Sequence, residues 1–208
     1  MAERNWYERH LLPLLTDLAC GIAPVRRQRE RIVPLARGRV LEVGIGTGRN
    51  LAHYDKGGIT TVIGLDPGLA MLARARRRAR RAGVEPELIG APAERIPFRD
   101  ASFDTVLVTY TLCSVADPLA ALAEMRRVLK PEGRLLFCEH GLAPDPAVRR
   151  WQARLTPLWS KLAGGCRLDR DVPALLRASG FRSDDLQCGY LPGPRVLAWN
   201  CWGTALAA

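Results

Sequence analysis

The 208-residue chain has no long hydrophobic run and no signal-peptide pattern. Its most apolar stretch, residues 11–20, is interrupted by Pro13 and Asp17, so it cannot span a bilayer. The first ten residues, MAERNWYERH, lack the basic segment, the apolar segment and the small-residue cleavage site of a secretory leader. We therefore expect a cytoplasmic protein without a transmembrane segment, long enough to bury a core of its own.

Closely spaced cysteines are also missing. The six cysteines occupy positions 20, 113, 138, 166, 188 and 201, and no two form a C-x-x-C pair. Structural zinc sites usually take closely spaced ligands, and disulfide frameworks belong to oxidising compartments. The sequence therefore predicts no metal ion, no disulfide framework, and cysteine side chains that mostly pack as small buried groups.

Lysine is scarce although the chain is basic, since 28 arginines and three lysines contribute to a formal net charge of +10. Six of the arginines lie in RARRRARR, residues 74–81, a pattern that can indicate a nucleic-acid interface. On a helix, however, Leu72, Ala75, Ala79 and Ala82 share one side, and the arginines spread over the other. We therefore expect the alanine side to pack on a sheet, the arginines to face solvent, and no nucleic-acid partner.

Short apolar runs alternate with helical patterns from residue 39 onwards. Strands are predicted at 39–44, 60–66, 85–90, 103–109 and 133–140, and helices at 47–53, 68–82 and 117–129. Further helices are predicted at 146–163 and 171–179, followed by two last strands, 184–190 and 195–203, around a hairpin loop at 191–194. The alternation predicts an α/β fold, a Rossmann-like, doubly wound and mostly parallel sheet of seven strands with an antiparallel C-terminal strand.

An amphipathic segment precedes this predicted sheet. Apolar residues recur at helical spacing between residues 6 and 18, although Pro13 interrupts them. Pro24 is placed as the first residue of a second helix that continues to about residue 36. We expect residues 1–36 to form an N-terminal helical cap and residues 37–208 to form the main domain.

A glycine-rich stretch, LEVGIGTGRN at residues 41–50, follows the first predicted strand. Gly44, Gly46 and Gly48 let the main chain turn sharply and let a ligand lie against bare backbone. Their spacing is G-x-G-x-G, whereas a dinucleotide fingerprint needs G-x-G-x-x-G. Glu42, two residues before the first glycine, disfavours a pyrophosphate and favours a ligand that carries an amino group or another cation.

This loop resembles the cofactor loop of class I S-adenosylmethionine-dependent methyltransferases. Three further segments are similar to the same family: GAPAERIPF (90–98), SFDTVLV (102–108) and LKPEGRLLF (129–137). Pro92 stands where the family commonly has Asp. The resemblance implies S-adenosylmethionine as the cofactor, S-adenosylhomocysteine as its product, and a carboxylate at the end of the second strand that accepts hydrogen bonds from the ribose. The cofactor contacts it implies are Glu42, Gly44, Gly46, Gly48, Asp66, Pro67, Ala93, Glu94 and Thr109.

The methyl acceptor is expected beyond the carboxyl ends of the fourth and fifth strands, at TYTLCSV (109–115) and CEHG (138–141). The (N/D)-P-P-(Y/F) and Pro-Cys patches of nucleic-acid methyltransferases are absent there, which favours a small molecule. His140 is the candidate catalytic base, because a histidine gains and loses a proton near neutral pH. Cys113 and Cys166 either line the acceptor pocket or pack in the core.

Aromatic residues near the start of the chain are the remaining candidates for substrate contact. Trp6, Tyr7 and His10 either form a lid over the acceptor or pack the first helix onto the core. Both interpretations stay open at this point, as does the choice between a monomer and a homodimer.

A closer resemblance lies outside the cofactor loop. LCSV, EH, LTPLW (155–159) and GGCRL (164–168) together resemble the methyltransferase-like family of alkyl-thiol S-methyltransferases and its bacterial relatives. The resemblance implies methylation of a small thiol. Two alternatives stay open: N-methylation of a phospholipid head group or another small amine, with peripheral contact of the basic, amphipathic start with a membrane, and nucleic-acid binding.

Overall fold

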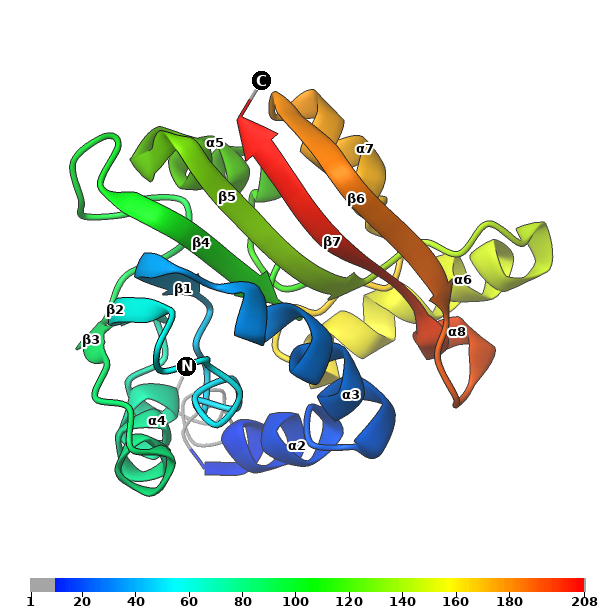
Figure 1. The fold of residues 1–208 in the computed structure, drawn as a ribbon. Helices are drawn as coiled ribbons and strands as arrows, with labels where there is room; N and C mark the ends of the chain where they lie inside the picture. The colour runs from blue at the N-terminus through cyan, green and yellow to red at the C-terminus, as the bar shows by residue number, and fades with distance from the viewer. Residues whose placement is uncertain (1–9, 208) are drawn as a thin grey trace.

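The computed structural model describes residues 10–207, and within them a sheet of seven strands carries helices on both faces (Figure 1). The strands are β1 (Gly38–Val43), β2 (Ile59–Leu65), β3 (Glu87–Ile89), β4 (Phe103–Thr109), β5 (Leu129–His140), β6 (Phe181–Tyr190) and β7 (Trp199–Ala207). The helices are α2 (Leu12–Ala19), α3 (Ala23–Ile32), α4 (Leu69–Ala82), α5 (Pro118–Val128), α6 (Pro146–Leu162), α7 (Val172–Ala178) and α8 (Arg195–Ala198), with a 3₁₀ turn, η2 (Val33–Leu35).

The strand order is β3-β2-β1-β4-β5-β7-β6, which confirms the predicted fold class. Strands β1 to β5 pair in parallel, and β7 runs antiparallel between β5 and β6. The order of the strands along the chain changes direction at β1, because β2 and β3 lie on one side of β1 and β4 and β5 lie on the other. In open α/β sheets, ligands bind at such a switch point, outside the carboxyl ends of the strands.

The central strands fill two core layers, one on each face of the sheet. Leu41 and Val106 belong to the layer that includes Leu122 of α5, whereas the adjacent Val40 and Leu107 belong to the other layer. Successive side chains of a strand point to opposite faces, so a buried parallel strand needs apolar residues at nearly every position. In Figure 1, α5 and α7 lie behind the sheet and α3 lies in front of it.

The helix predicted at residues 47–53 is wrong, because the chain forms a series of tight turns there. The amide of Gly48 donates to the carbonyl of Ile45, and the amide of His53 donates to the carbonyl of Asn50. Gly48 has a φ of +78°, which lies outside the right-handed helical region. Gly48 lies within the predicted helix, and its positive φ angle prevents a regular helix from forming there.

The C-terminal hairpin differs from the prediction in two ways. Residues 195–198 form the short helix α8, so the last strand begins only at Trp199. Cys188 and Cys201 form a disulfide, with an S–S distance of 2.04 Å, where unpaired buried cysteines were expected. They lie directly opposite each other on β6 and β7. The sequence separation of 13 residues gives no sign of this pairing, since the strand register creates it.

The two N-terminal helices meet the sheet through the end of α3. Ile32 and Val33 are buried in a core layer, and α3 contacts β5 and β7. Helix α2, by contrast, leaves Leu14, Leu15 and Leu18 exposed. Within residues 10–207, no helix combines the length and the hydropathy needed to cross a membrane.

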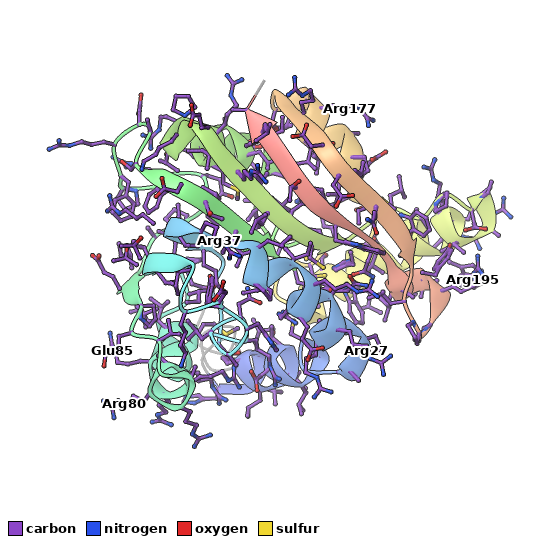
Figure 2. The ribbon with its side chains drawn as sticks, viewed as in Figure 1. Arg27, Arg37, Arg80, Glu85, Arg177 and Arg195 are labelled. Carbon is purple, nitrogen blue, oxygen red and sulfur yellow. A yellow bond between two sulfur atoms is a disulfide. The ribbon has the colours of Figure 1, made fainter. Side chains whose placement is uncertain are left out.

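Helix α4 follows the predicted division into a small-residue side and an arginine side, with one exception. Leu72, Ala75 and Ala79 are buried, and Arg80 at the outer end of the helix points away from the sheet (Figure 2). Arg78 is the exception, because it turns toward the glycine-rich loop and makes ion-pair and hydrogen-bond contacts there. The expectation that every arginine of residues 74–81 faces solvent is therefore wrong at this position.

Gly203 is the most constrained glycine of the hairpin and generates a prediction. Its φ is +152°, and a Cβ at this position would lie 1.6 Å from the carbonyl oxygen of Asp185 on β6. We expect Gly203→Ala to destabilise the protein by more than about 2 kcal/mol in urea unfolding, because the strands must separate to make room. Gly57→Ala is the matched control, since only Asp55 Oδ1 lies near its Cβ, at 3.6 Å. Equal stability of the two variants would contradict this account.

Candidate cofactor and methyl-acceptor site

The glycine-rich loop after β1 is shaped by three positive φ angles, +71° at Gly44, +54° at Gly46 and +78° at Gly48. A Cβ on Gly44 would lie 2.1 Å from Thr111 Oγ1, and one on Gly48 would lie 3.0 Å from the Cα of Ala75. At Gly46, by contrast, only the Gly44 carbonyl lies within 4 Å, at 3.9 Å. Gly44 and Gly48 therefore let the loop pack directly against Thr111 and Ala75, and Gly46 presents bare backbone that a ligand can approach.

Glu42 lies beneath this loop rather than at its surface. Its carboxylate is 1% exposed and accepts hydrogen bonds from Asn50 Nδ2 at 2.9 Å and from the Tyr54 hydroxyl at 2.7 Å. Asn50 Nδ2 also donates to Thr109 Oγ1 at 2.9 Å, which joins β1 to the end of β4. Burial raises the pKa of Glu42 to about 7, against the opposing effect of its two hydrogen bonds. Both Glu42 oxygens therefore already have donors from the protein.

Asp66 directly follows β2 and binds the loop through the main chain. Its Oδ2 accepts from the amide of Gly46 at 3.0 Å, and its Oδ1 accepts from the amide of Gly68 at 2.8 Å. Burial raises the pKa of Asp66, and these two hydrogen bonds act in the opposite direction. Pro67 beside it is exposed. The carboxylate thus orders the loop and lies beside its open glycine.

The predicted adenine segment places its two candidate residues differently. Ala93 is buried, with 6% of its surface exposed. Glu94 Oε1 accepts hydrogen bonds from the amides of Ala116 at 2.9 Å and Asp117 at 3.1 Å. Glu94 therefore fixes the segment that enters α5.

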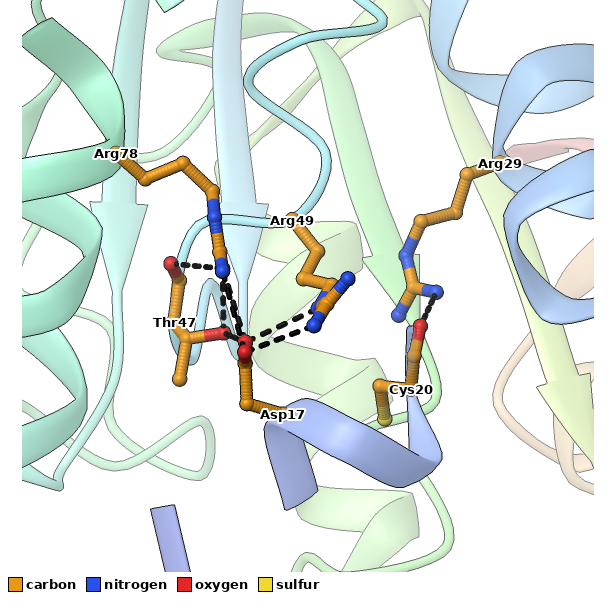
Figure 3. Close-up of polar contacts among 6 residues, drawn as sticks. All are labelled: Asp17, Cys20, Arg29, Thr47, Arg49 and Arg78. Atoms are coloured by element: carbon orange, nitrogen blue, oxygen red, sulfur yellow. Dashed lines mark hydrogen bonds and ion pairs between the residues drawn. The ribbon is translucent and has the colours of Figure 1, made fainter. Parts of the chain in front are cut away.

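Asp17 connects helix α2 to the glycine-rich loop and to α4 (Figure 3). Its carboxylate forms ion pairs with Arg49 at 2.8 Å and with Arg78 at 3.0 Å, and the Thr47 hydroxyl also donates to it. Arg78 donates in addition to the Thr47 carbonyl at 2.7 Å. Burial alone would raise the pKa of Asp17, but the hydrogen bonds from Arg78, Arg49 and Thr47 outweigh it and hold the pKa well below its usual range. We call this set of four residues the Asp17 cluster.

Arg29 brings a buried positive charge from α3 to the same end of the sheet. Only 4% of its surface is exposed, its Nη1 donates to the Cys20 carbonyl at 2.7 Å, and its guanidinium lies 5.0 Å from the ring centroid of Tyr110. Within residues 10–207, the Nε of Arg29 is buried without a hydrogen-bond partner. The charge of Arg29 lowers the pKa of Glu42 and so offsets part of the cost of burying that carboxylate.

Thr111 links the glycine-rich loop to the end of β5. Its hydroxyl lies 3.4 Å from the Gly44 carbonyl, and its amide donates to Glu139 Oε1 at 2.7 Å. Glu139 is completely buried, and burial raises its pKa to about 7 against the opposing backbone hydrogen bonds. The end of β5 is therefore tied through one residue to the glycine-rich loop.

Three of the predicted acceptor residues lie together next to this link. Nε2 of His140 lies 3.1 Å from Sγ of Cys166, and Sγ of Cys113 completes a group whose three atoms all lie within 4.8 Å of one another. Trp159 Nε1 donates to Cys166 Sγ at 3.3 Å. The contact with the Cys113 sulfur and burial both raise the pKa of the Cys166 thiol, because both favour its protonated form. The structure therefore brings Cys113 and Cys166 next to His140, and their role as acceptor contacts stays a prediction.

Of the three candidate substrate contacts near the start of the chain, only His10 lies within the described residues. Trp6 and Tyr7 lie outside the described residues. His10 is exposed at the beginning of the described chain. Their role as a lid stays a prediction.

The site contains further residues that were not predicted from the sequence: Asp17, Arg29, Thr47, Arg49, Asn50, Tyr54, Arg78, Thr111, Glu139 and Trp159. Asn50 ends the glycine-rich stretch and Tyr54 follows it shortly after, so their closeness to Glu42 in the sequence could have indicated the contact. Asp17 and Arg29 gave no signal, because their contacts depend on where the two N-terminal helices lie on the main domain.

Comparisons with known proteins agree with this geometry. Residues 41–137 match the family model described as a methyltransferase domain. Human thiol S-methyltransferase TMT1B is 34% identical over 79% of this chain and 67% of its own length. Phosphatidylethanolamine N-methyltransferase of Cereibacter sphaeroides is 38% identical over 55% of this chain and 57% of its own. A solved S-adenosylmethionine-dependent methyltransferase from Leishmania major superimposes with a TM-score of 0.70, at 16% identity over 98% of this chain and 82% of that one.

The chain belongs to the class I S-adenosylmethionine-dependent methyltransferases, whose methyl donor is S-adenosylmethionine. This membership confirms the resemblance of the glycine-rich loop and the strand order. The chain spans about half to two thirds of the length of the curated relatives it matches. These relatives have different methyl acceptors in their names, so membership of the family does not identify the acceptor.

The contribution of the Asp17 cluster to stability can be tested by substituting Asp17. Asp17→Asn keeps the shape of the side chain but removes the charge that Arg49 and Arg78 share. We expect a loss of about 1–3 kcal/mol in the free energy of unfolding and faster amide exchange in α2. Asp55→Asn, whose ion pair with Arg37 is exposed, should change stability by less than about 0.5 kcal/mol. Unchanged exchange of α2 in Asp17→Asn would show that the ion pairs do not hold this helix.

Proposed function

We propose that this chain transfers the methyl group of S-adenosylmethionine to the sulfur atom of a small thiol. One observation carries the proposal: beside the carboxyl ends of β4 and β5, an imidazole nitrogen and two thiol sulfurs lie within 4.8 Å of one another, and Thr111 ties this place to the glycine-rich loop. The relation to a thiol S-methyltransferase over 79% of the chain supports the same acceptor.

We propose that the cofactor lies along the open side of Gly46, with its ribose hydroxyls on Asp66. A carboxylate can accept from two adjacent hydroxyls while each oxygen keeps its backbone donor. Pro67 and the Ala93 amide are placed by the same proposal at the ribose and at an adenine ring nitrogen.

The other predicted cofactor residues would support the residues that contact the cofactor rather than contact it themselves. Glu42, Thr109 and Glu94 already accept hydrogen bonds from protein donors. We propose that they hold the glycine-rich loop, the end of β4 and the entry to α5 in place. Residues 1–36 are proposed to be a separate cap, whose described helices reach the loop through the Asp17 cluster.

The acceptor chemistry follows from the charges of the reactants. Methyl transfer from a sulfonium is an in-line displacement that needs alignment and a site poor in water. A thiolate and a sulfonium neutralise each other as they react, so apolar and sulfur-containing walls favour this reaction. His140 is the proposed base for the acceptor thiol, because its imidazole already faces a sulfur atom at 3.1 Å.

An amine acceptor is the second candidate. The related phosphatidylethanolamine N-methyltransferase and the exposed leucines of α2, with Leu18 69% exposed, favour it. A basic chain with an apolar helix face could bring the site to an anionic lipid surface. The acceptor screen described below separates the two candidates.

Asp66 tests the cofactor assignment. We expect Asp66→Ala to weaken binding of S-adenosylmethionine by about 10- to 100-fold in calorimetric titrations, because a hydrogen-bonded carboxylate is worth about 1.5–3 kcal/mol. Asp100→Ala is the matched control, since the Asp100 side chain is 78% exposed and pairs only with Arg127 among the described contacts. Unchanged affinity in Asp66→Ala would show that the ribose binds elsewhere.

The methyl acceptor is tested by a screen of labelled-methyl transfer to alkyl thiols, amines, phenols and lipid vesicles. We expect transfer to alkyl thiols, and a loss of about 10²- to 10⁴-fold in kcat for His140→Ala. The loss should shrink above about pH 8.5, where the thiol ionises without help. His53→Ala serves as the control histidine. Transfer to phosphatidylethanolamine vesicles and to no thiol would replace the thiol by the amine acceptor.

A further inference from the structure

The space in front of His140 combines three metal-binding side chains from distant parts of the chain. Cys113 follows β4, His140 ends β5, and Cys166 lies after α6. Cys113 is buried, and His140 and Cys166 are half-buried. Thiolate and imidazole are the ligands that Zn²⁺ prefers in proteins.

The main chain is shaped to bring the two cysteines together. Gly164 and Gly165, just before Cys166, have φ angles of +60° and +89°, which other residues rarely adopt. A Cβ on Gly165 would lie 3.1 Å from the carbonyl oxygen of Ser114, beside Cys113. The amide of Arg167 then donates to the Cys113 carbonyl at 2.8 Å. These contacts join the two cysteine-bearing segments directly.

The spacing of the ligand atoms is close to that of a zinc site. With zinc bonds of about 2.3 Å to sulfur and about 2.0 Å to nitrogen, tetrahedral ligand atoms lie about 3.5–3.8 Å apart. The three atoms here lie within 4.8 Å of one another, and Nε2 of His140 is 3.1 Å from Sγ of Cys166. Adjustments of about 1 Å or less would therefore complete the tetrahedral spacing.

Hydrogen-bond donors surround the two sulfur atoms. Trp159 Nε1 donates to Cys166 Sγ at 3.3 Å, and the hydroxyl of Ser114 lies 3.4 Å from Cys113 Sγ. Donors of this kind orient metal-bound thiolates and stabilise their charge. Two thiolates would also balance the charge of one divalent ion. The group therefore has the supporting contacts that an isolated set of ligands lacks.

We propose that Cys113, His140 and Cys166 bind one Zn²⁺ ion and leave its fourth position open. Three protein ligands with one open position are the arrangement of catalytic zinc, whereas structural zinc sites are closed by four. As a second part, which rests on the proposed function, the acceptor thiol occupies the fourth position. The expectation of no metal relied on the absence of closely spaced cysteines, whereas here the fold assembles the ligands.

Zinc would change how the acceptor is activated. The bound thiol releases its proton to water and becomes a thiolate on the metal. Its lone pair then forms the new sulfur–carbon bond, while the bond between the methyl group and the sulfonium breaks and leaves its electron pair on the donor sulfur. The products are a neutral thioether and S-adenosylhomocysteine. In the zinc-loaded protein His140 Nε2 is a ligand, and the metal replaces it as the group that deprotonates the thiol.

Cobalt titration of the full chain tests the metal site. Protein purified without a polyhistidine tag and freed of metal with a chelator is titrated with Co²⁺, then with Zn²⁺. We expect one Co²⁺ per chain, with tetrahedral visible bands and a thiolate-to-cobalt band in the near ultraviolet, and loss of both bands on adding one equivalent of Zn²⁺. Cys113→Ser and Cys166→Ser should each weaken the thiolate band, and the double variant should lose it. Cys20→Ala, the matched control, should keep the full spectrum.

Circular dichroism confirms that each variant is folded before its spectrum is compared. Absence of bands at stoichiometric Co²⁺, or a thiolate band that survives in the Cys113→Ser/Cys166→Ser variant, would overturn the proposal. For the second part, an alkyl thiol should strengthen the thiolate band of the cobalt protein, and the matching thioether should not. A spectrum that the thiol leaves unchanged would remove the acceptor from the metal.

The metal site and the proposed function can fail separately. Cobalt bands without methyl transfer to any thiol would keep the site and reject the thiol acceptor. Thiol methylation that survives in chelator-treated protein without cobalt bands would reject the site and keep the function.

Discussion

At the carboxyl end of β1, Gly44 and Gly48 bring the main chain so close to Thr111 and Ala75 that neither has room for a Cβ. This close approach places the ends of β1 and β4 and the middle of α4 around one loop. It also explains why α4 carries small alanines on its inner side, since a larger residue at position 75 would push the helix off the loop. Gly46 between them stays open, so the same constraint leaves bare backbone for the cofactor.

Two polar systems then hold this loop from opposite sides. Below it, Glu42 is buried with Asn50 and Tyr54 as donors, and a buried carboxylate is tolerated because each oxygen has a partner. Above it, Asp17 ties the loop to α2 through two arginines. The hydrogen bonds of the first system join residues 42, 50 and 54, although the charge of Arg29 on α3 also acts on Glu42. The second exists only when the N-terminal helices are in place, so it couples the position of those helices to the cofactor loop.

The acceptor end depends on a different balance, between an imidazole and two thiols in a partly buried space. Without a metal, Cys166 Sγ lies within hydrogen-bonding distance of His140 Nε2, and the contact with Cys113 and burial raise the pKa of the Cys166 thiol. With a metal, the same atoms become ligands and the thiols lose their protons. Cys188 and Cys201 have a different outcome, since the strand register places them directly opposite each other and they form a disulfide.

The amino-acid sequence alone predicted the fold class and the position of the glycine-rich loop, because alternating apolar runs and the G-x-G-x-G spacing are local patterns. The role of Asp66 as the ribose carboxylate was implied by the family resemblance and stays a prediction. The sequence also indicated that the segments carrying Cys113 and His140 lie near each other, because they follow or end neighbouring parallel strands, β4 and β5. It misplaced a helix at 47–53, where positive φ angles of the glycines override the helical pattern. Three contacts depend on the tertiary structure and could not be predicted from local patterns. Arg78 turns inward to Asp17, and Cys188 pairs with Cys201. The thiols of Cys113 and Cys166 and the imidazole of His140 come within 4.8 Å of one another. Each of these contacts joins residues far apart in the chain, and distance along the chain carries no information about distance in space until the strands are in register.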